Sequence, residues 1–384
     1  MKVVHVIEPM EHGVFIWVID MANNLVECGY DVTVIHSLRE ATPENWRELF
    51  DPRVKLIHIQ MGRAINPITD IKALFRITRA LKRIGPDVIH GHSSKSGVLA
   101  RAAGFLLRQN KRTIYTSHAI HYPLIEQPLK RSIYKLLELV AYWMGGTIVA
   151  CSKREYDIIL DEITNKNPAR LRCISNGIDL SQIQVKDYNI AKPESEKVRI
   201  GVLGRVSNQK APWVFAAIAK TLLAKHNNVE FVWVGGGEPE DEKPLREAGV
   251  LITGFLDRDQ AIEETARLDI FLQTSLYEGL SLALLEAQAA GIPAVVTNIP
   301  GNDEVVQHEQ CGFVGNNETE LAAFTERLIL SSALREQLGM GARRYVENHF
   351  SFDAMGDQYK ALYEEAAAAY ETKVVATVGQ NSGR

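Results

Sequence analysis

The chain has 384 residues, which favours two domains of ordinary size over a single one. Apolar residues make up 46% of it and charged residues 23%, which is typical of a folded globular protein and excludes a disordered or collagen-like chain. No apolar run approaches the roughly 18 residues of a membrane-spanning helix, and the first apolar run is predicted to be a strand and not a signal peptide. The four cysteines have neither metal-ligand nor disulfide-framework spacing, so we expect a cytoplasmic protein.

The net charge of −4 is unevenly distributed along the chain. Residues 1–194 carry 26 basic and 20 acidic side chains, whereas the remainder carries 17 basic and 27 acidic ones. The basic excess is strongest at 63–112, where 11 basic residues accompany two acidic ones. This asymmetry predicts that the N-terminal half meets an anionic partner.

Strand-like and helix-like segments alternate through the first half. We predict strands at 3–7, 31–36, 54–59, 87–90, 113–116, 146–151 and 172–175. Helices are predicted at 15–28, 69–84 and 134–144, and two more are predicted to begin at 98 and after 152. This alternation predicts a parallel sheet with crossover helices. Gly13 lies just before the first helix, where a residue without a side chain lets the backbone approach a phosphate or simply serves a turn.

The predicted helix at 69–84 is amphipathic. Its apolar side is expected to contain Ile71, Leu74, Thr78 and Leu81. Its basic side carries Lys72, Arg76, Arg79 and Arg83. That side either docks on an anionic membrane surface or is an ordinary solvated face. The helix at 134–144 is predicted to pack in the core, with insertion into a bilayer interface as the alternative.

Two histidines lie at the C-terminal ends of predicted strands. His92 follows the strand at 87–90, and His118 follows the strand at 113–116. Ligands of open parallel sheets bind beyond these strand ends. Both histidines are therefore candidate site residues, and the alternative for each is a structural role.

A polar segment at 179–197 is predicted to be an interdomain linker, and a second strand–helix series follows it. Its strands are expected at 199–203, 230–234, 250–253, 269–272 and 294–297. Gly204 ends the first of these strands, and a helix begins at Pro212. Arg205 and Lys210 flank the turn between them, where their cationic groups suit the oxygens of a diphosphate.

The segment 271–291 passes from a strand through a polar turn into a helix capped by Ser281. Glu278 lies in the turn and Glu286 in the second turn of the helix. Backbone N–H groups near Gly279 and Leu280 lie at the positive end of the helix dipole and suit a phosphate. Carboxylates accept hydrogen bonds from sugar hydroxyls, so the segment suits a nucleotide sugar. Acidic residues near a helix start are also favoured by the dipole alone.

The segment Asp257-Arg258-Asp259 has the Asp-x-Asp pattern that holds a divalent metal in some sugar transferases. It precedes a predicted helix at 260–267, where acidic residues cap the helix and complement its dipole. We therefore assign it to capping and expect no bound metal.

Several short motifs occur together and in order along the chain. They are Ser117-His118, Cys151-Ser152, Asn176-Gly177-Ile178-Asp179, Gly204-Arg205 with Lys210, and Glu278 to Glu286 followed by Ala290-Gly291-Ile292-Pro293. In this the chain resembles the retaining glycosyltransferases of glycosyltransferase family 4. The resemblance implies the α/β GT-B fold, with two Rossmann-like domains at 1–178 and 198–352. It also implies a final helix at 353–371 that crosses back to the first domain, and the residues after it predict a flexible tail at 372–384.

The resemblance also implies a role for each matching residue. Arg205 and Lys210 would neutralise the donor diphosphate, Glu286 would hold the ribose, and Glu278 would hold the transferred sugar. His118 would contact the sugar or the reacting region, and Gly13 would let the first loop approach the phosphates. The remaining donor contacts would come from Gly204, Gly279, Leu280, Ser281 and Leu282.

The predicted function is transfer of a sugar, from a UDP-sugar by preference, to a glycan or lipid-linked acceptor in polysaccharide, lipopolysaccharide or glycolipid synthesis. The enzyme is expected to retain the anomeric configuration without a metal, and to work in the cytoplasm or on the inner face of the membrane. The alternatives are a nucleotide-sugar epimerase of the same architecture and a non-catalytic nucleotide-sugar binding module.

Overall fold

The structure is a computed structural model that describes all residues except 11, 40–41, 63, 119, 121, 123–124, 126, 189–196 and 382–384. The chain forms two compact units, the first made of Met1–Ser175 with Gly356–Arg384 and the second of Asn176–Met355. The predicted linker at 179–197 falls within the second unit, and its residues 189–196 lie outside the described part.

The first unit contains a seven-stranded parallel sheet with the order β3-β2-β1-β4-β5-β6-β7. Its strands are β1 (Lys2–Ile7), β2 (Asp31–His36), β3 (Lys55–His58), β4 (Val88–His92), β5 (Thr113–Thr116), β6 (Thr147–Ala150) and β7 (Leu171–Cys173). The strand order reverses between β1 and β4, which defines the switch point where ligands bind in sheets of this kind.

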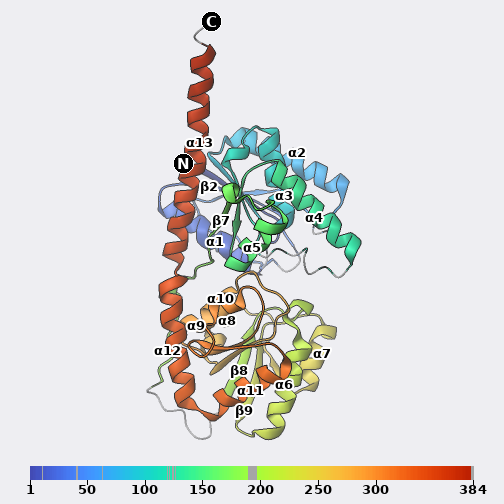
Figure 1. The fold of residues 1–384 in the computed structure, drawn as a ribbon, viewed down its shortest axis with the longest axis vertical. Helices are drawn as coiled ribbons and strands as arrows, with labels where there is room; N and C mark the ends of the chain where they lie inside the picture. The colour runs from blue at the N-terminus through green and yellow to red at the C-terminus, as the bar shows by residue number, and fades with distance from the viewer. Residues whose placement is uncertain are drawn as a thin grey trace. The chain divides into compact units, whose positions relative to one another are not determined.

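Helices cover both faces of this sheet (Figure 1). They are α1 (His12–Glu27), α2 (Pro67–Ile84), α3 (Ser93–Leu106), α4 (Pro128–Trp143), α5 (Lys153–Glu162) and, from Gly356 on, α13 (Phe352–Asn381). Two helices start earlier than predicted: α1 contains Gly13 in its first turn, and α3 begins directly after β4. The final helix continues through 372–381, where a flexible tail is predicted, and 382–384 lie outside the described residues.

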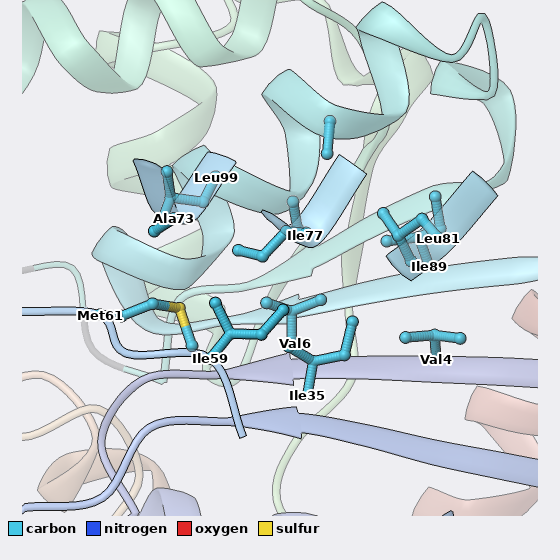
Figure 2. Close-up of a cluster of buried hydrophobic side chains, with 12 residues drawn as sticks. Val4, Val6, Ile35, Ile59, Met61, Ala73, Ile77, Leu81, Ile89 and Leu99 are labelled. Atoms are coloured by element: carbon cyan, nitrogen blue, oxygen red, sulfur yellow. The ribbon is translucent and has the colours of Figure 1, made fainter. Parts of the chain in front are cut away.

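Helix α2 buries most of the predicted apolar side: Leu81 is buried, and Leu74 and Thr78 are partly buried. Asn66 caps its start and Gly85, in the left-handed conformation, ends it. Its buried residues are Ala73, Ile77 and Leu81, which pack with strand residues and α3 in the apolar cluster of Figure 2. Ile71, predicted on the apolar side, is instead 66% exposed. The basic residues Lys72, Arg76, Arg79 and Arg83 are exposed, as the amphipathic pattern predicts.

Helix α4 packs in the core with one side only, where Tyr134, Leu139 and Tyr142 are partly buried against an apolar cluster of the first unit. Only Glu138 and Ala141 are buried among its residues. A stripe of large apolar side chains is exposed instead. It consists of Leu129, Ile133, Leu136, Val140 and Trp143, which are between 44% and 83% exposed. The spacing of this stripe is that of a core-facing helix, so sequence periodicity cannot tell whether a protein surface covers it.

The second unit contains a six-stranded parallel sheet with the order β10-β9-β8-β11-β12-β13. Its strands are β8 (Val198–Leu203), β9 (Val229–Val234), β10 (Leu251–Ile252), β11 (Ile270–Gln273), β12 (Ala294–Thr297) and β13 (Gly312–Gly315). Its helices are α6 (Pro212–Lys225), α7 (Pro239–Glu247), α8 (Arg258–Ala266), α9 (Leu282–Ala289), α10 (Asn302–Val305), α11 (Glu318–Leu330) and α12 (Ser332–His349). Helices α6 and α11 pack together, as do α8 and α9 (Figure 1).

Asp257 is the N-cap of α8, as predicted. Its side chain accepts a hydrogen bond from the backbone N–H of Gln260, and the Gln260 side chain accepts one from the N–H of Asp257. This reciprocal capping box accounts for the acidic residue at this position without a ligand. Among the described residues, no helix is long and apolar enough to cross a bilayer.

Candidate active site

The second unit gathers most of the predicted site residues at the ends of β8 and β11. These neighbouring strands lie where the strand order reverses, which is the position where open parallel sheets bind ligands. The segment 204–210 follows β8, and the segment 274–281 follows β11. The sheet topology therefore brings Lys210 and Glu278 together although they are 68 residues apart.

Lys210 and Glu278 form an ion pair with 2.6 Å between Nζ and Oε1. The Lys210 side chain is 13% exposed and that of Glu278 is 8% exposed. Glu278 also accepts hydrogen bonds from the Ser275 hydroxyl at 2.7 Å and from the Gln209 side-chain amide at 3.4 Å. A cation and a carboxylate are thus held at one point, largely removed from solvent.

Gly204 makes room for the Lys210 side chain. Its φ of +151° is outside the range that residues with a side chain usually adopt, and a Cβ there would lie 3.2 Å from the Cε of Lys210. Arg205 is the next residue, and its guanidinium lies 3.7 Å from the exposed carboxylate of Glu238. The turn after β8 therefore places two cationic side chains close together in sequence, one buried and one partly exposed.

Backbone hydrogen bonds join the segments that follow β8 and β11. The N–H of Leu276 donates to the carbonyl of Gln209 at 2.8 Å, and the Thr274 hydroxyl donates to the carbonyl of Lys210 at 2.9 Å. The Gln209 side chain donates to the carbonyl of Tyr277 at 3.1 Å. These contacts fix the position of Lys210 relative to Glu278, and Gln209 is a member of the site that the sequence did not reveal.

The start of α9 is built as predicted. The Ser281 hydroxyl accepts a hydrogen bond from the N–H of Leu284, which leaves the first helical N–H groups, beginning at Leu282, at the helix end. The Asn176 side chain donates to the carbonyl of Leu280 at 3.2 Å. The φ of Gly301 is +88°, and a Cβ there would overlap the carbonyl oxygen of Gly279. The backbone around Gly279 and Leu280 is thus constrained from two sides.

Glu286 lies in the second turn of α9 and is 8% exposed. The guanidinium of Arg258 lies 3.8 Å from its carboxylate. Arg258 is the middle residue of the Asp-x-Asp segment, so this segment contributes a cation beside Glu286. In the sequence, only the two aspartates of that segment suggest a function.

His118 and Gly13 belong to the first unit. Gly13 is exposed in the first turn of α1. His118 follows β5, has a left-handed backbone with a φ of +57°, and is partly exposed. Its Nε2 lies 3.0 Å from Nδ1 of His92, and the Trp17 ring packs edge-on against it with 5.2 Å between centroids.

Glu155 bonds to residues on both sides of His118, a role that the sequence did not reveal. Its buried carboxylate accepts hydrogen bonds from the Ser117 hydroxyl at 2.7 Å and from the N–H of Ile120 at 2.8 Å. The backbone N–H of Cys151 donates to its other oxygen at 2.8 Å. The spacing Ser152-x-x-Glu155 has the form of a capping box, which is the signal that the sequence offered.

Two Rossmann-like units in one chain, with a cation, carboxylates and a helix start at the switch point of the second, fit the GT-B class of nucleotide-sugar enzymes. Two family models match the chain. The model described as "Glycosyltransferase Family 4" matches residues 12–182, and that described as "Glycosyl transferases group 1" matches residues 197–331. The chain belongs to glycosyltransferase family 4.

Two relatives of this chain are named as glycosyltransferases. An Escherichia coli protein named "UDP-Gal:alpha-D-GlcNAc-diphosphoundecaprenol alpha-1,3-galactosyltransferase" is 27% identical over 321 residues, covering 78% of this chain and 81% of that protein. The capsular polysaccharide biosynthesis glycosyltransferase CapM of Staphylococcus aureus is 24% identical, covering 79% of this chain and 83% of that protein.

Solved structures share the fold across nearly the whole chain. A sucrose-phosphate synthase from Thermosynechococcus elongatus has a TM-score of 0.79 at 20% identity, covering 96% of this chain and 100% of that one. Anabaena Alr3699/HepE in complex with UDP-glucose has a TM-score of 0.77 at 19% identity, with the same coverage. At these identities the likeness concerns the fold, and it confirms the predicted GT-B architecture.

Proposed function

We propose that this glycosyltransferase moves a sugar from a UDP-sugar to a lipid-linked glycan acceptor in the synthesis of a surface polysaccharide or glycolipid. The pairing of Lys210 with Glu278 at the switch point is the observation that carries this proposal. The name of the E. coli relative, which contains a UDP-sugar donor and a diphosphoundecaprenol acceptor, supports the choice of donor and acceptor. The UDP-glucose complex of the Anabaena protein supports the same donor class.

In this proposal each site residue meets one part of the donor. Lys210 and Arg205 neutralise the diphosphate, together with backbone N–H groups near Gly279 to Leu282 at the start of α9. Glu286 accepts hydrogen bonds from the ribose, and Glu278 accepts them from the transferred sugar. Gly204 gives Lys210 its path to the phosphates. His118 and Gly13 act from the first unit, on the sugar and on the phosphates respectively.

The proposed chemistry follows from the charges that develop as the sugar leaves. The sugar becomes positive and the diphosphate more negative, so fixed cations and oriented N–H groups stabilise the transition state. We propose attack by the acceptor on the face that the diphosphate leaves, with a phosphate oxygen taking the acceptor's proton. The anomeric configuration is then retained, and no carboxylate nucleophile is needed.

We further propose that this reaction needs no divalent metal. Asp257, the first carboxylate of the Asp-x-Asp segment, caps α8, and Arg258 beside it already supplies a cation near Glu286. Activity should persist in excess EDTA. Loss of activity in EDTA that Mg²⁺ or Mn²⁺ restores would return Asp257 and Asp259 to consideration as metal ligands.

The donor can be tested by binding. Thermal unfolding in the presence of UDP-, GDP- and ADP-sugars should show the largest stabilisation with a UDP-sugar, because a ligand that binds only the folded state raises its stability. Glu286→Ala should weaken that stabilisation and lower kcat/KM at least roughly tenfold, or about 1.4 kcal/mol. Equal stabilisation of wild type and Glu286→Ala by every nucleotide sugar would contradict the assignment.

Product analysis separates transfer from the two other activities considered for this architecture. A transferase releases nucleoside diphosphate in the presence of an acceptor. An epimerase leaves a nucleotide sugar with altered stereochemistry, and a binding module leaves the donor unchanged. Release of nucleoside diphosphate that depends on the acceptor is the expected result.

We also propose that the first unit docks on an anionic membrane surface through α2 and α4. Both helices contact α3 and expose large apolar side chains, among them Ile68 and Phe75 on α2 and Trp143 on α4. The single acidic residue of each helix is paired with a basic residue of α3: Asp70 with Lys95, and Glu138 with Arg101.

The remaining charges of these two helices are basic. They are Lys72, Arg76, Arg79, Lys82 and Arg83 on α2, and Lys130, Arg131 and Lys135 on α4. An exposed apolar stripe flanked by basic groups is the composition that inserts into the interface of an anionic bilayer. Each basic group near such a surface contributes on the order of 1 kcal/mol.

Co-sedimentation with vesicles tests this docking. The protein should bind vesicles that contain phosphatidylglycerol, bind neutral vesicles weakly, and dissociate as salt is raised. Leu136→Ser with Trp143→Ser should reduce binding at least tenfold, as should neutralisation of Lys72, Arg76, Arg79 and Arg83 by glutamine. Leu330→Ser is the matched control, since Leu330 is 71% exposed in the second unit.

Unchanged binding by both sets of variants would contradict the docking proposal. So would a stable dimer in solution that Leu136→Ser with Trp143→Ser dissociates, because the apolar stripe would then be covered by a second copy of the chain. Activity on a soluble acceptor separates this outcome from failure of the transferase proposal, since neither set of variants alters the donor site.

A further inference from the structure

Three histidines of the first unit form a hydrogen-bonded chain from the buried sheet to His118, which is partly exposed. The Nδ1 of His5, on β1, lies 2.9 Å from the Nε2 of His92, on β4. The Nδ1 of His92 lies 3.0 Å from the Nε2 of His118. His5 and His92 are completely buried, whereas His118 is partly exposed. The chain therefore has one closed end and one end that a ligand can reach.

Burial favours the neutral form of all three imidazoles, because it lowers their pKa values. The pKa of His5 falls to about 3. A neutral imidazole has one N–H donor and one acceptor nitrogen. Two consecutive hydrogen bonds in such a chain therefore allow only two arrangements of the protons, and both bonds reverse together.

The two arrangements differ at their ends. In the first, His5 donates to His92 and His92 donates to His118, so the N–H of His118 is on Nδ1. In the second, His118 donates inward and His5 carries its N–H on Nε2. The Nε2 of His5 is buried, and no described residue lies within hydrogen-bonding distance of it. A buried donor without a partner is rarer in folded proteins than an unused acceptor, which favours the first arrangement.

The same region contains a group that a metal ion could use. Ligand nitrogens of His5, His90 and His92 lie within 4.8 Å of one another. However, His90 is bonded through Nδ1 to the Tyr363 hydroxyl at 2.7 Å and through Nε2 to the Thr116 hydroxyl at 2.8 Å. Both nitrogens of His92 are also occupied. Hydrogen bonding thus accounts for every ring nitrogen of the group except the Nε2 of His5.

We propose that His92, supported by His5, is a positioning residue that fixes the tautomer of His118, so that His118 presents its Nδ1–H as a donor to an oxygen of the bound substrate. This inference depends on the proposed function, because it takes His118 as a substrate contact. It also assigns the direction of that contact: His118 donates a hydrogen bond and does not act as a general base. The acceptor hydroxyl must then lose its proton to another group, in agreement with the phosphate oxygen proposed above.

The histidine tautomers can be observed directly. In protein labelled with ¹⁵N at histidine, protonated and unprotonated ring nitrogens have well-separated ¹⁵N chemical shifts. Correlation spectra assign these shifts to each ring. His118 should carry its proton on Nδ1 in the wild type. His92→Leu removes the donor to His118 and should produce a mixture of tautomers. Protonation of His118 on Nε2 in the wild type overturns the proposal.

Kinetics supply the second measurement. His92→Leu should lower kcat by roughly ten- to a hundredfold, as is common when the group that orients a functional histidine is lost, with the KM for the donor changed less than about twofold. His92→Asn should recover most of the rate, because its amide N–H can replace the Nδ1–H donor. His58→Leu, at an exposed histidine of the same unit, is the control. A wild-type kcat in folded His92→Leu overturns the proposal.

Variants at His118 test the donor role itself. Asparagine places an N–H near the position of Nδ1, so His118→Asn should be at least tenfold more active than His118→Ala. Equal loss in both variants would indicate a general base and overturn the proposed direction. Full activity of His118→Ala would show that His118 makes no functional contact with the substrate and would overturn the proposal. The ¹⁵N spectra would still show which ring nitrogens of the histidine chain carry protons. Stoichiometric zinc in the purified protein, lost in His5→Leu, would replace the hydrogen-bonded chain with a metal site.

Discussion

Replacing Lys210 with methionine separates the charge of this side chain from its packing. Methionine keeps an unbranched chain in the space beside Gly204, but it lacks the ammonium group that lies 2.6 Å from Glu278. The carboxylate of Glu278, with only 8% of its side chain exposed, then keeps the Ser275 hydroxyl at 2.7 Å as its nearest donor. The variant therefore has two separate effects, one on stability and one on catalysis.

The effect on stability can be bounded from the environment of the pair. Removing one partner of a fully buried ion pair costs about 3–5 kcal/mol. Because Ser275 still donates to Glu278 and both partners keep some exposure, we expect the free energy of unfolding to fall by about 2 kcal/mol. Adding Glu278→Gln removes the unpaired charge and should recover most of this loss.

The effect on catalysis should not be recovered in this way. Lys210→Met should lower kcat/KM at least about tenfold, or ~1.4 kcal/mol of transition-state stabilisation, because the leaving diphosphate lacks its cation. The double variant should be stable and still impaired. Urea unfolding and release of nucleoside diphosphate measure the two effects.

Lys225→Met is the matched control for this experiment. Lys225 forms an exposed ion pair with Glu326, and such pairs contribute about 0–1 kcal/mol. Its loss should leave both stability and activity nearly unchanged. The reasoning is refuted if Lys210→Met turns over the donor as fast as Lys225→Met, or if Glu278→Gln does not restore stability.

The remaining predictions concern the backbone of the donor site, the support of His118 and the response to acid. Gly235→Ala should lower the free energy of unfolding by about 3 kcal/mol, and Gly254→Ala should lower it by about 1 kcal/mol. Both glycines have a positive φ, but only at Gly235 would a Cβ overlap a carbonyl oxygen. Equal melting temperatures of the two variants would contradict this. Glu155→Gln should cost about 2 kcal/mol in urea unfolding and lower kcat, since a donor loses its acceptor beside His118; a wild-type rate would argue against that support. Acidification should destabilise the protein through His5, whose pKa is about 6.5 in the unfolded chain and about 3 in the native protein. Between pH 8 and pH 5 only the unfolded chain binds this proton, so the free energy of unfolding should fall by about 2 kcal/mol. In His5→Leu the fall should be smaller.

The parallel architecture could be predicted because each strand is a short apolar run followed by a helix with its own start signals. Helix starts were predicted at Pro212, Asp257 and Ser281, and the structure has helices that begin there. The closeness of Lys210 and Glu278 could be anticipated as well, because both residues lie just after central strands of one sheet, whereas their ion pair is seen only in the structure. Local pattern and topology were sufficient for these features.

Other features depend on contacts that no local pattern contains. The early start of α3 is an example: Gly97 suggests a turn, but it lies within the helix, at a position where a side chain would overlap the Tyr115 ring. The apolar stripe of α4 has core-like periodicity although it is exposed. The bond between His90 and Tyr363 joins residues 273 positions apart, so only the fold reveals it.

The hydroxyls of Tyr363 and Tyr359 tie the last helix into the first unit, through His90 and Thr116 respectively. The first unit therefore needs residues that the ribosome makes only after the whole second unit, which is continuous from Asn176 to Met355. During synthesis the second unit can complete its fold first, while the first waits with its histidine-lined sheet uncovered. Premature termination directly after Met355 would thus release a chain with an intact second unit and an open first one.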